Sequence, residues 1–198
     1  MTSYLNHTLK QYLDELSSES PVPRGGGTSA LSASLGLALA LMVARIAVRK
    51  LTGAKKKRLE KVIGLLEKMR TDSEEIIDID PKVYGEVMAA YKRAKGAGDP
   101  AKAQEDINAA LANSFRLQAD LALLIAMAKE LLIEVGEFAK GSIRNDLIVS
   151  SGLLDGAFQG ASATARINVV YMKAGAKKLH FEQALKKLDR KFEKIKFS

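Results

Sequence analysis

The 198-residue sequence predicts an all-α fold: a helical bundle of six or seven helices, formed by a single domain over residues 1–198. Apolar residues recur three and four positions apart in nearly every long segment, which is the period of an α-helix. No valine-rich alternating stretch predicts a strand, and no repeat of fixed period is present. With 47% hydrophobic residues, a chain of this length forms one well-buried core and is short for two.

Two central helices rich in alanine and glycine are expected, at residues 28–50 and roughly 143–172. The first has small or apolar residues at almost every position, with Gly36 near its middle, and the second interleaves glycines such as Gly152 with apolar residues. Small side chains let neighbouring helices approach closely, so we expect these two helices to pack together. Arg45 interrupts the apolar run of the first helix, which favours a buried core helix over a membrane span.

The first half of the chain is divided by proline-containing turns. A short amphipathic helix at the N-terminus ends at the serine- and proline-rich turn 17–23, and a helix with a charged outer face follows the first central helix at about residues 59–69. Asp80 before Pro81 is typical of an N-cap followed by proline in the first helical turn. A separate helix is therefore predicted to start there.

The second half follows the same rules. Asp99 before Pro100 predicts another N-cap, and apolar spacing from there to about residue 140 predicts a very long helix. Residues 173–198 predict a lysine-rich amphipathic helix, which is most simply a solvated helix face.

A glycine run opens the first central helix. Gly25, Gly26 and Gly27 allow the backbone to adopt positive φ and to approach a ligand or another backbone closely, and Thr28 or Ser29 can cap the helix that follows. Such a helix N-terminus suits an anion such as a carboxylate. The run matches neither common glycine-rich phosphate signature, so from spacing alone a flexible turn into a buried helix is the simpler explanation.

Composition excludes several classes of function. The sequence has no cysteine, so it has neither disulfides nor thiolate metal sites, and its two histidines, His7 and His180, lie near opposite ends. We therefore expect no metal. The N-terminus lacks the order of a signal peptide, which favours a cytoplasmic protein. The net charge of +8 favours anionic partners, but the basic residues are dispersed and form no recognition helix, so a nucleic-acid-binding protein is not expected.

Five short motifs occur in an order that resembles the cyclodeaminase/cyclohydrolase family of folate enzymes. They are Pro-Val-Pro-Arg-Gly-Gly-Gly at 21–27, the alanine-rich helix closing with Met42-Val43, Asp80 with Tyr84 and Val-Met-Ala-Ala-Tyr at 87–91, Asn145-Asp146, and Arg166-Ile167-Asn168. Each motif alone is weak evidence. Together they span nearly the whole chain at compatible separations.

The resemblance implies a fold, a substrate and a reaction. Members are all-helical bundles that pair into homodimers and bind a tetrahydrofolate derivative as substrate, with no metal. A cyclodeaminase closes 5-formiminotetrahydrofolate to 5,10-methenyltetrahydrofolate and releases ammonia, whereas a cyclohydrolase opens the methenyl compound with water. Either reaction needs proton transfers near a cationic carbon. The sequence does not decide between the two activities.

The resemblance also implies roles for particular residues. Asp80 is expected to be the general acid/base, and Asp146 is expected to stabilise the cationic centre. The positions expected to bind substrate are Pro23, Arg24, Gly25, Gly26, Gly27, Tyr84, Asn145, Arg166 and Asn168. Helix capping by Asp80 and a helix-dipole role for Asp146 are the simpler alternatives.

Several positions depart from the family pattern. Arg24 stands where the first glycine is expected, Arg45 and Ala47 fall where Asn and Thr are common, and Thr164 and Asn145 replace an asparagine and a serine. Because several of the replaced groups are polar residues of the expected cleft, the sequence also allows a diverged, non-catalytic helical protein that binds a ligand or acts in an assembly.

Overall fold

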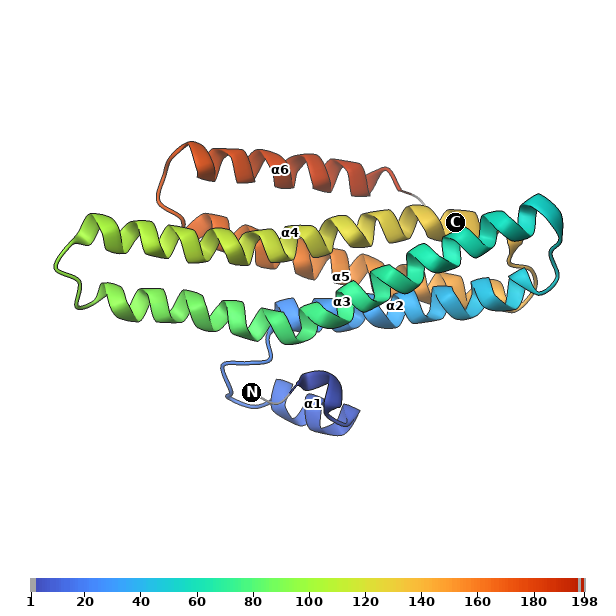
Figure 1. Ribbon diagram of the computed structural model, residues 1–198, viewed down its shortest axis with the longest axis horizontal. Coiled ribbons are helices and arrows are strands. Elements are labelled where there is room, and N and C mark those ends of the chain that lie inside the picture. The colour runs from blue at the N-terminus through green and yellow to red at the C-terminus, as the bar shows by residue number, and fades with distance from the viewer. Residues whose placement is uncertain (1–2, 196, 198) are drawn as a thin grey trace.

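The computed structural model describes residues 3–195 and 197, and within them every regular element is a helix, with no strand (Figure 1). The all-α prediction is confirmed. A single 3-10 turn, η1, precedes six α-helices in the described part of the chain. Their bounds are η1 Tyr4–Asn6, α1 Leu9–Leu16, α2 Gly25–Val48, α3 Gly53–Ala94, α4 Pro100–Phe138, α5 Ile143–Tyr171 and α6 Ala176–Glu193.

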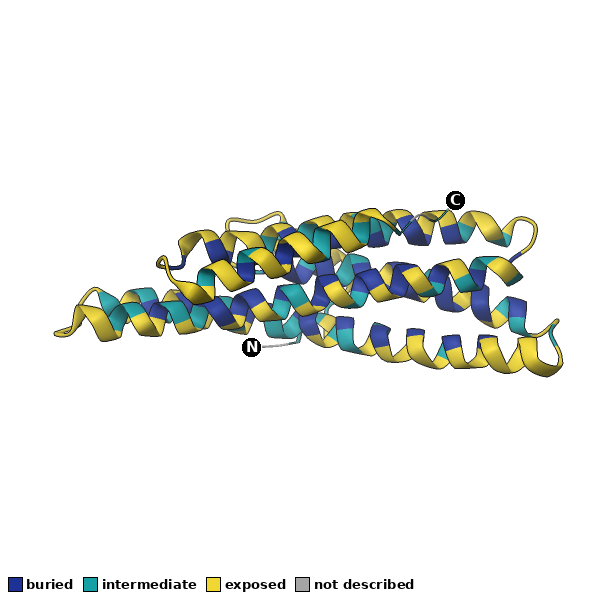
Figure 2. Cartoon of the chain, turned by 90° about the horizontal axis from the view of Figure 1, so that it is seen from above, coloured by how far each residue is buried: buried dark blue, intermediate teal, exposed yellow. Residues whose placement is uncertain are grey.

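The four helices α2 to α5 run up and down along one long axis, with α6 beside the bundle on one side and α1 on the other (Figure 1). Short turns join α2 to α3 and α4 to α5 at the same end. Gly53 and Gly141 lie at these turns with φ of 59° and 69°, a conformation that a side chain disfavours. Buried positions follow the inward sides of the helices, whereas the outward sides are exposed (Figure 2).

The two alanine- and glycine-rich helices pack directly against each other, as the sequence predicts. A Cβ added at Gly36 of α2 would lie 3.0 Å from Cγ of Leu154 of α5, so only glycine fits without movement of this neighbour. The Ser150 hydroxyl donates to the Gly36 carbonyl at 2.6 Å, and the Ser32 hydroxyl donates to the Leu153 carbonyl at 3.0 Å. Small residues thus bring the two backbones close enough for side-chain-to-backbone hydrogen bonds between helices.

The prediction of a separate helix from Asp80 is wrong, because α3 is one helix of 42 residues with Pro81 inside it. Proline lacks an N–H and leaves the carbonyl four residues earlier, that of Ile77, without its helical partner. This carbonyl lies beside the start of α2, 3.4 Å from the position of a Cβ at Gly27. Figure 1 shows α3 changing direction partway along its length, as expected for a helix that contains proline. Burial of Ile77 and Val87 on the two sides of the proline holds the helix together.

The predicted cap and length of α4 are confirmed. The Asp99 carboxylate accepts from the backbone N–H groups of Ala101 and Lys102 at 2.9 and 3.1 Å, with Pro100 in the first turn. Further along α4, the buried Lys129 ammonium donates to Ser151 and Asp155 of α5, each at 2.7 Å. These bonds satisfy a buried charge and tie α4 to α5.

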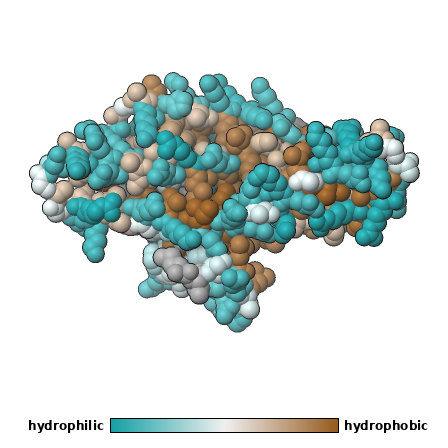
Figure 3. Space-filling model, in the orientation of Figure 1, coloured by the Kyte–Doolittle hydropathy of each residue, from teal (hydrophilic) through white to brown (hydrophobic). Residues whose placement is uncertain are grey.

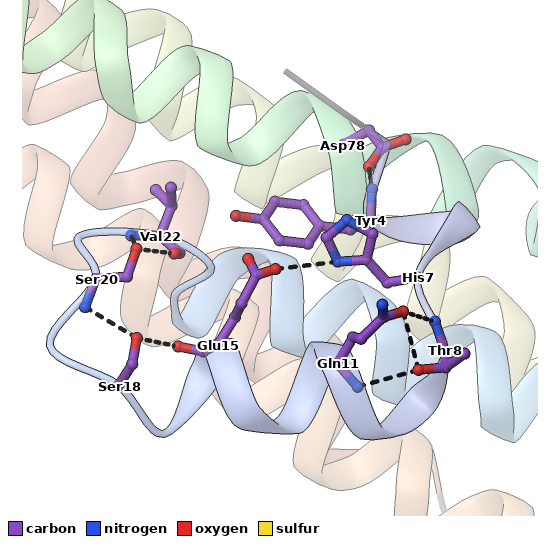
Figure 4. A network of polar contacts seen from close by, with 9 residues as sticks. All are labelled: Tyr4, His7, Thr8, Gln11, Glu15, Ser18, Ser20, Val22 and Asp78. Carbon is purple, nitrogen blue, oxygen red and sulfur yellow. Dashed lines mark hydrogen bonds and ion pairs between the residues drawn. The ribbon is translucent and has the colours of Figure 1, made fainter.

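The N-terminal segment docks on α3 through polar contacts (Figure 4). Asp78 of α3 accepts from the Tyr4 backbone N–H at 2.6 Å and from the Ser3 hydroxyl. The next helix, α1, begins with a capping box between Thr8 and Gln11. Tyr12 of α1 is buried against the start of α2, so this segment covers one side of the region described next.

One side of α2 is not covered by any of the described residues. Leu35 and Met42 have 51% and 39% of their surface exposed, on a helix with small or apolar residues at almost every position. By length and composition α2 is apolar enough to cross a membrane, and half of its most apolar stretch is buried in the bundle. The core helix of a soluble protein has the same properties.

Candidate functional site

A cavity of about 520 Å³ opens where α2 begins, partway along the bundle. Helix α2 has 24 residues, whereas α3 has 42. Because α2 begins partway along the bundle, the part of the bundle on the far side of its first residue is formed by α3, α4 and α5 alone, around a space that α2 does not fill. The lining is mostly apolar, with tyrosines from α3 and α5: Tyr84, Tyr91 and Tyr171. Figure 3 shows hydrophobic side chains gathered over the middle of one face of the molecule, and hydrophilic ones toward both ends.

Asp80 lies at the inner wall of this cavity and is 6% exposed. Its Oδ2 accepts a hydrogen bond from the Gly27 N–H at 3.0 Å, and its Oδ1 accepts one from the Gln118 side-chain amide at 2.7 Å. Burial raises the pKa of the Asp80 carboxyl, while these two hydrogen bonds act in the opposite direction. The site therefore contains a buried carboxyl group, fixed by two donors, at the surface of a cavity that can admit a ligand.

The glycine run has a different structure from the one predicted. Gly25 to Gly27 form the first turn of α2, and none of them has positive φ. Thr28 and Ser29 do not cap the helix, because their hydroxyls donate to the carbonyls four residues earlier. The expected anion at this helix N-terminus is nevertheless present, and it is the side chain of Asp80.

Close approach explains why glycine is needed at the centre of the run. A Cβ added at Gly26 would overlap Oδ1 of Asp80 and the Gln118 amide nitrogen, and would lie 2.7 Å from Cγ of Asp80. A side chain at this position would displace the carboxylate from its two donors.

Arg24 lies at the mouth of the cavity and precedes the first turn of α2. Its Nε donates to the Pro21 carbonyl at 2.6 Å, and its guanidinium stacks over the Tyr84 ring, 4.8 Å from the ring centre. This arrangement holds a positive charge at the edge of the cavity, on a residue that is exposed.

Five of the predicted site residues besides Asp80 line this one cavity: Arg24, Gly25, Gly26, Tyr84 and Asn168. Gly27 binds Asp80 from behind it. The Asn168 side chain is buried and donates to the Thr164 carbonyl one turn earlier at 2.8 Å. Thr164 itself, noted in the sequence as a departure, also lines the cavity.

The other predicted residues do not join Asp80 within one chain. Asn145 and Asp146 are in the first turn of α5, and the 18 residues from Asp146 to Thr164 correspond to about 27 Å of helix. Arg166 projects toward α6, where it pairs with Asp189 at 2.7 Å. Pro23 is buried after a cis peptide bond and does not line the cavity. A single cleft holding all of them is therefore not formed by one chain, and roles for these residues in binding or catalysis stay predictions.

Gln118, which donates to Asp80, is a site residue that the sequence did not predict. It occupies the apolar stripe of α4, between the buried Phe115 and Leu121, and it is fully buried itself. A polar residue on an otherwise apolar stripe was the available signal. Its partner, 38 positions earlier in the chain, was not visible in the sequence.

Comparison with known proteins identifies the family. Residues 8–187 match the family model described as formiminotransferase-cyclodeaminase. This chain belongs to that family. It is also 25% identical, over 93% of its length and 88% of the relative's, to the methenyltetrahydrofolate cyclohydrolase of Methylorubrum extorquens.

The fold of the family member agrees with a solved structure. The formiminotetrahydrofolate cyclodeaminase of Thermotoga maritima superposes with a TM-score of 0.72 at 21% identity, covering 96% of this chain and 91% of that one. At this identity the likeness supports the fold alone. Within residues 3–195 and 197, no group of three or more His, Asp or Glu side chains is placed to share a metal ion.

Proposed function

We propose that this family member is a folate one-carbon enzyme that forms or opens the ring of 5,10-methenyltetrahydrofolate. The observation that carries the proposal is Asp80, a buried and doubly hydrogen-bonded carboxyl group at the wall of a cavity. The family description and the name of the cyclohydrolase relative support the substrate class. In this proposal the cyclohydrolase and cyclodeaminase activities use the same site. A cyclohydrolase consumes water to open the ring, whereas a cyclodeaminase releases ammonia as the ring closes.

The chemistry requires one group that takes and returns a proton beside a cationic carbon. In hydrolysis, water adds to the methenyl carbon, Asp80 accepts the water proton, and the C–N bond then breaks with proton transfer to that nitrogen. In cyclodeamination, a ring-closing nitrogen adds to the formimino carbon and ammonia leaves after protonation. The ionised carboxylate also opposes the positive charge of the methenyl group, a form of electrostatic stabilisation.

The cavity suits such a substrate in size and chemistry. Its volume of about 520 Å³ lies in the range of small-molecule sites, which is about 300–1,000 Å³. Tyrosine rings on α3 and α5 provide flat apolar surfaces for the aromatic rings of a folate. Arg24 at the entrance provides a positive charge for its carboxylate tail.

An absorbance assay tests this function, because 5,10-methenyltetrahydrofolate absorbs in the near ultraviolet where its open forms do not. We expect the purified protein to lower this absorbance when given the methenyl compound, or to raise it when given 5-formiminotetrahydrofolate, and the substrate that responds assigns the activity. Heat-denatured protein is the control for the spontaneous reaction. Folate binding without any change in absorbance would favour the non-catalytic alternative.

We further propose that the protein is a homodimer that covers the exposed apolar side of α2 and α5. The chain exposes Leu35 and Met42 on α2, and Ile148 and Val149 on α5, by between 39% and 56% of their surface. Large apolar side chains exposed on two neighbouring helices are typical of an interface.

Light scattering is expected to give the mass of two 21.4 kDa chains at micromolar concentration. Leu35→Glu is expected to lower this mass toward that of one chain, because it places a charge on the proposed interface. Leu65→Glu, which changes a comparably exposed leucine on α3, is the matched control and is expected to leave the mass unchanged. A monomer mass for the unaltered chain would contradict the proposal.

A further inference from the structure

The side-chain amide of Gln118 has two features that helix packing alone does not explain. It is fully buried on α4, and its nitrogen donates to Oδ1 of Asp80 at 2.7 Å. Its oxygen, Oε1, is also buried and has no hydrogen-bond partner among the described residues. A buried acceptor without a partner is unfavourable, and such exceptions in folded proteins call for an explanation.

Apart from the contact with Asp80, Gln118 has apolar neighbours. Its neighbours along the same stripe of α4, Phe115 and Leu121, belong to the hydrophobic core. An apolar side chain of similar size would remove the unsatisfied oxygen, but it would leave Oδ1 of Asp80 without this donor. The contact with Asp80 is therefore the property that glutamine supplies here.

This contact affects both the charge of the Asp80 carboxylate and its orientation. Gly27, at the start of α2, donates to one oxygen of Asp80, and Gln118, on α4, donates to the other. Two donors from different helices fix the plane of the group and favour its ionised form, in opposition to burial. The Gly27 donor is a backbone N–H, whereas the Gln118 donor is a side-chain amide. A substitution can therefore remove the Gln118 donor without altering the backbone.

Building on the proposed function above, we propose that Gln118 is a positioning residue of this site. It holds the Asp80 carboxylate in its ionised, proton-accepting form and fixes the side of it that faces the cavity.

The other groups around Asp80 do not replace this contribution. Tyr12 of α1 is buried nearby, and burial raises the pKa of its hydroxyl. Arg24 lies at the cavity mouth and is stacked on Tyr84. The remaining polar groups that line the cavity are Tyr91 of α3, Ser114 of α4, and Thr164, Asn168 and Tyr171 of α5.

A titration of Asp80 itself tests the inference. The protein is labelled with ¹³C at aspartate carboxyl groups, and the Asp80 signal is assigned by its absence from the Asp80→Asn variant. In Gln118→Met, which removes the donor and keeps the side-chain length, we expect the titration midpoint of Asp80 to rise by about one pH unit, a tenfold change in the proton equilibrium. The acid limb of the pH profile of kcat/KM is expected to move up by the same amount.

A second variant keeps the test informative if the methionine variant does not fold. Gln118→Glu preserves the shape of the side chain and places a second carboxyl group against Asp80, so the pair is expected to titrate with one midpoint above that of Asp80 in the unaltered protein. Gln104→Met is the matched control on the same helix, because it removes a hydrogen bond between two residues that do not line the cavity, Gln104 and Asn108. It is expected to shift neither the Asp80 midpoint nor the activity.

The outcomes separate this inference from the proposed function. An unchanged Asp80 midpoint in the folded Gln118 variants would overturn the role of Gln118, whatever the activity. A raised midpoint in a protein that is inactive on both folate substrates would support the role of Gln118 and contradict the proposed enzyme.

Discussion

Asp80→Asn is expected to lower the turnover number measured in the absorbance assay by about 10²–10⁴-fold, which is the usual contribution of a positioned general acid/base. The substitution removes the titratable proton and the negative charge but keeps the size of the side chain. Turnover numbers of the purified variant and the unaltered protein, measured at saturating substrate, check this result. Retention of the full rate would remove Asp80 from the mechanism and leave it as a structural link between α2, α3 and α4.

The fold is expected to tolerate the same substitution. Asparagine can accept from the Gly27 N–H through its oxygen, and Gln118 can turn its amide so that its free oxygen accepts from the new amide nitrogen. We therefore expect the melting temperature at neutral pH to stay within a few degrees of the original value or to rise. If the variant instead loses much stability, its lower activity could come from unfolded protein. The assay would then be repeated at a temperature where both proteins are fully folded.

The pH dependence of this stability difference has a definite sign. Burial raises the pKa of Asp80 in the folded protein above its unfolded value of about 3.9. A carboxyl group with a raised pKa contributes stability below the unfolded pKa, and the contribution is lost as pH rises through the folded pKa. Relative to the unaltered protein, Asp80→Asn is therefore expected to become more stable as pH rises from about 4 through the raised pKa of the folded protein. Urea unfolding across this range measures the difference.

Gly26→Ala is expected to cause the second large loss, about 10²-fold in kcat/KM, because a misplacement of about 1 Å at a reacting group has an effect of that size. The added Cβ overlaps Asp80 and Gln118, so the carboxylate must leave at least one of its donors. We also expect a destabilisation of about 1–3 kcal/mol, as is usual for overpacking. The assay and urea unfolding measure the two effects.

Gly64→Ala is the matched control for this glycine substitution. Gly64 lies within α3, and a Cβ added there meets no atom within 4 Å. The change is expected to leave activity unaltered and to stabilise the helix by about 0.5–1 kcal/mol, because alanine restricts the unfolded chain more than glycine does. Unchanged activity in Gly26→Ala would show that the contact with Asp80 is not needed for function.

The sequence by itself determined the helical class, the position of most helices and the pairing of the two central ones. These follow from local physics, since apolar periodicity sets which face is buried, and Asp99 with Pro100 sets where α4 begins. The sequence also indicated Asp80 and Gly26, through the motifs that contain them. Small residues in both central helices were enough to predict a close approach, because backbone proximity requires side chains of that size.

Only the tertiary structure decided what Asp80 does. The Asp80-Pro81 pair has the local signature of a helix start, yet burial of α3 on both sides of the proline offsets the one lost hydrogen bond, so the helix continues. The carboxylate then meets Gly27 and Gln118, which are 53 and 38 residues away in the chain. Tertiary structure also decided that the side chains of Asp146 and Arg166 lie away from this cavity. Side-chain periodicity gives the face of a helix, whereas the length and start of α2 relative to its neighbours determine where along that face a cavity opens.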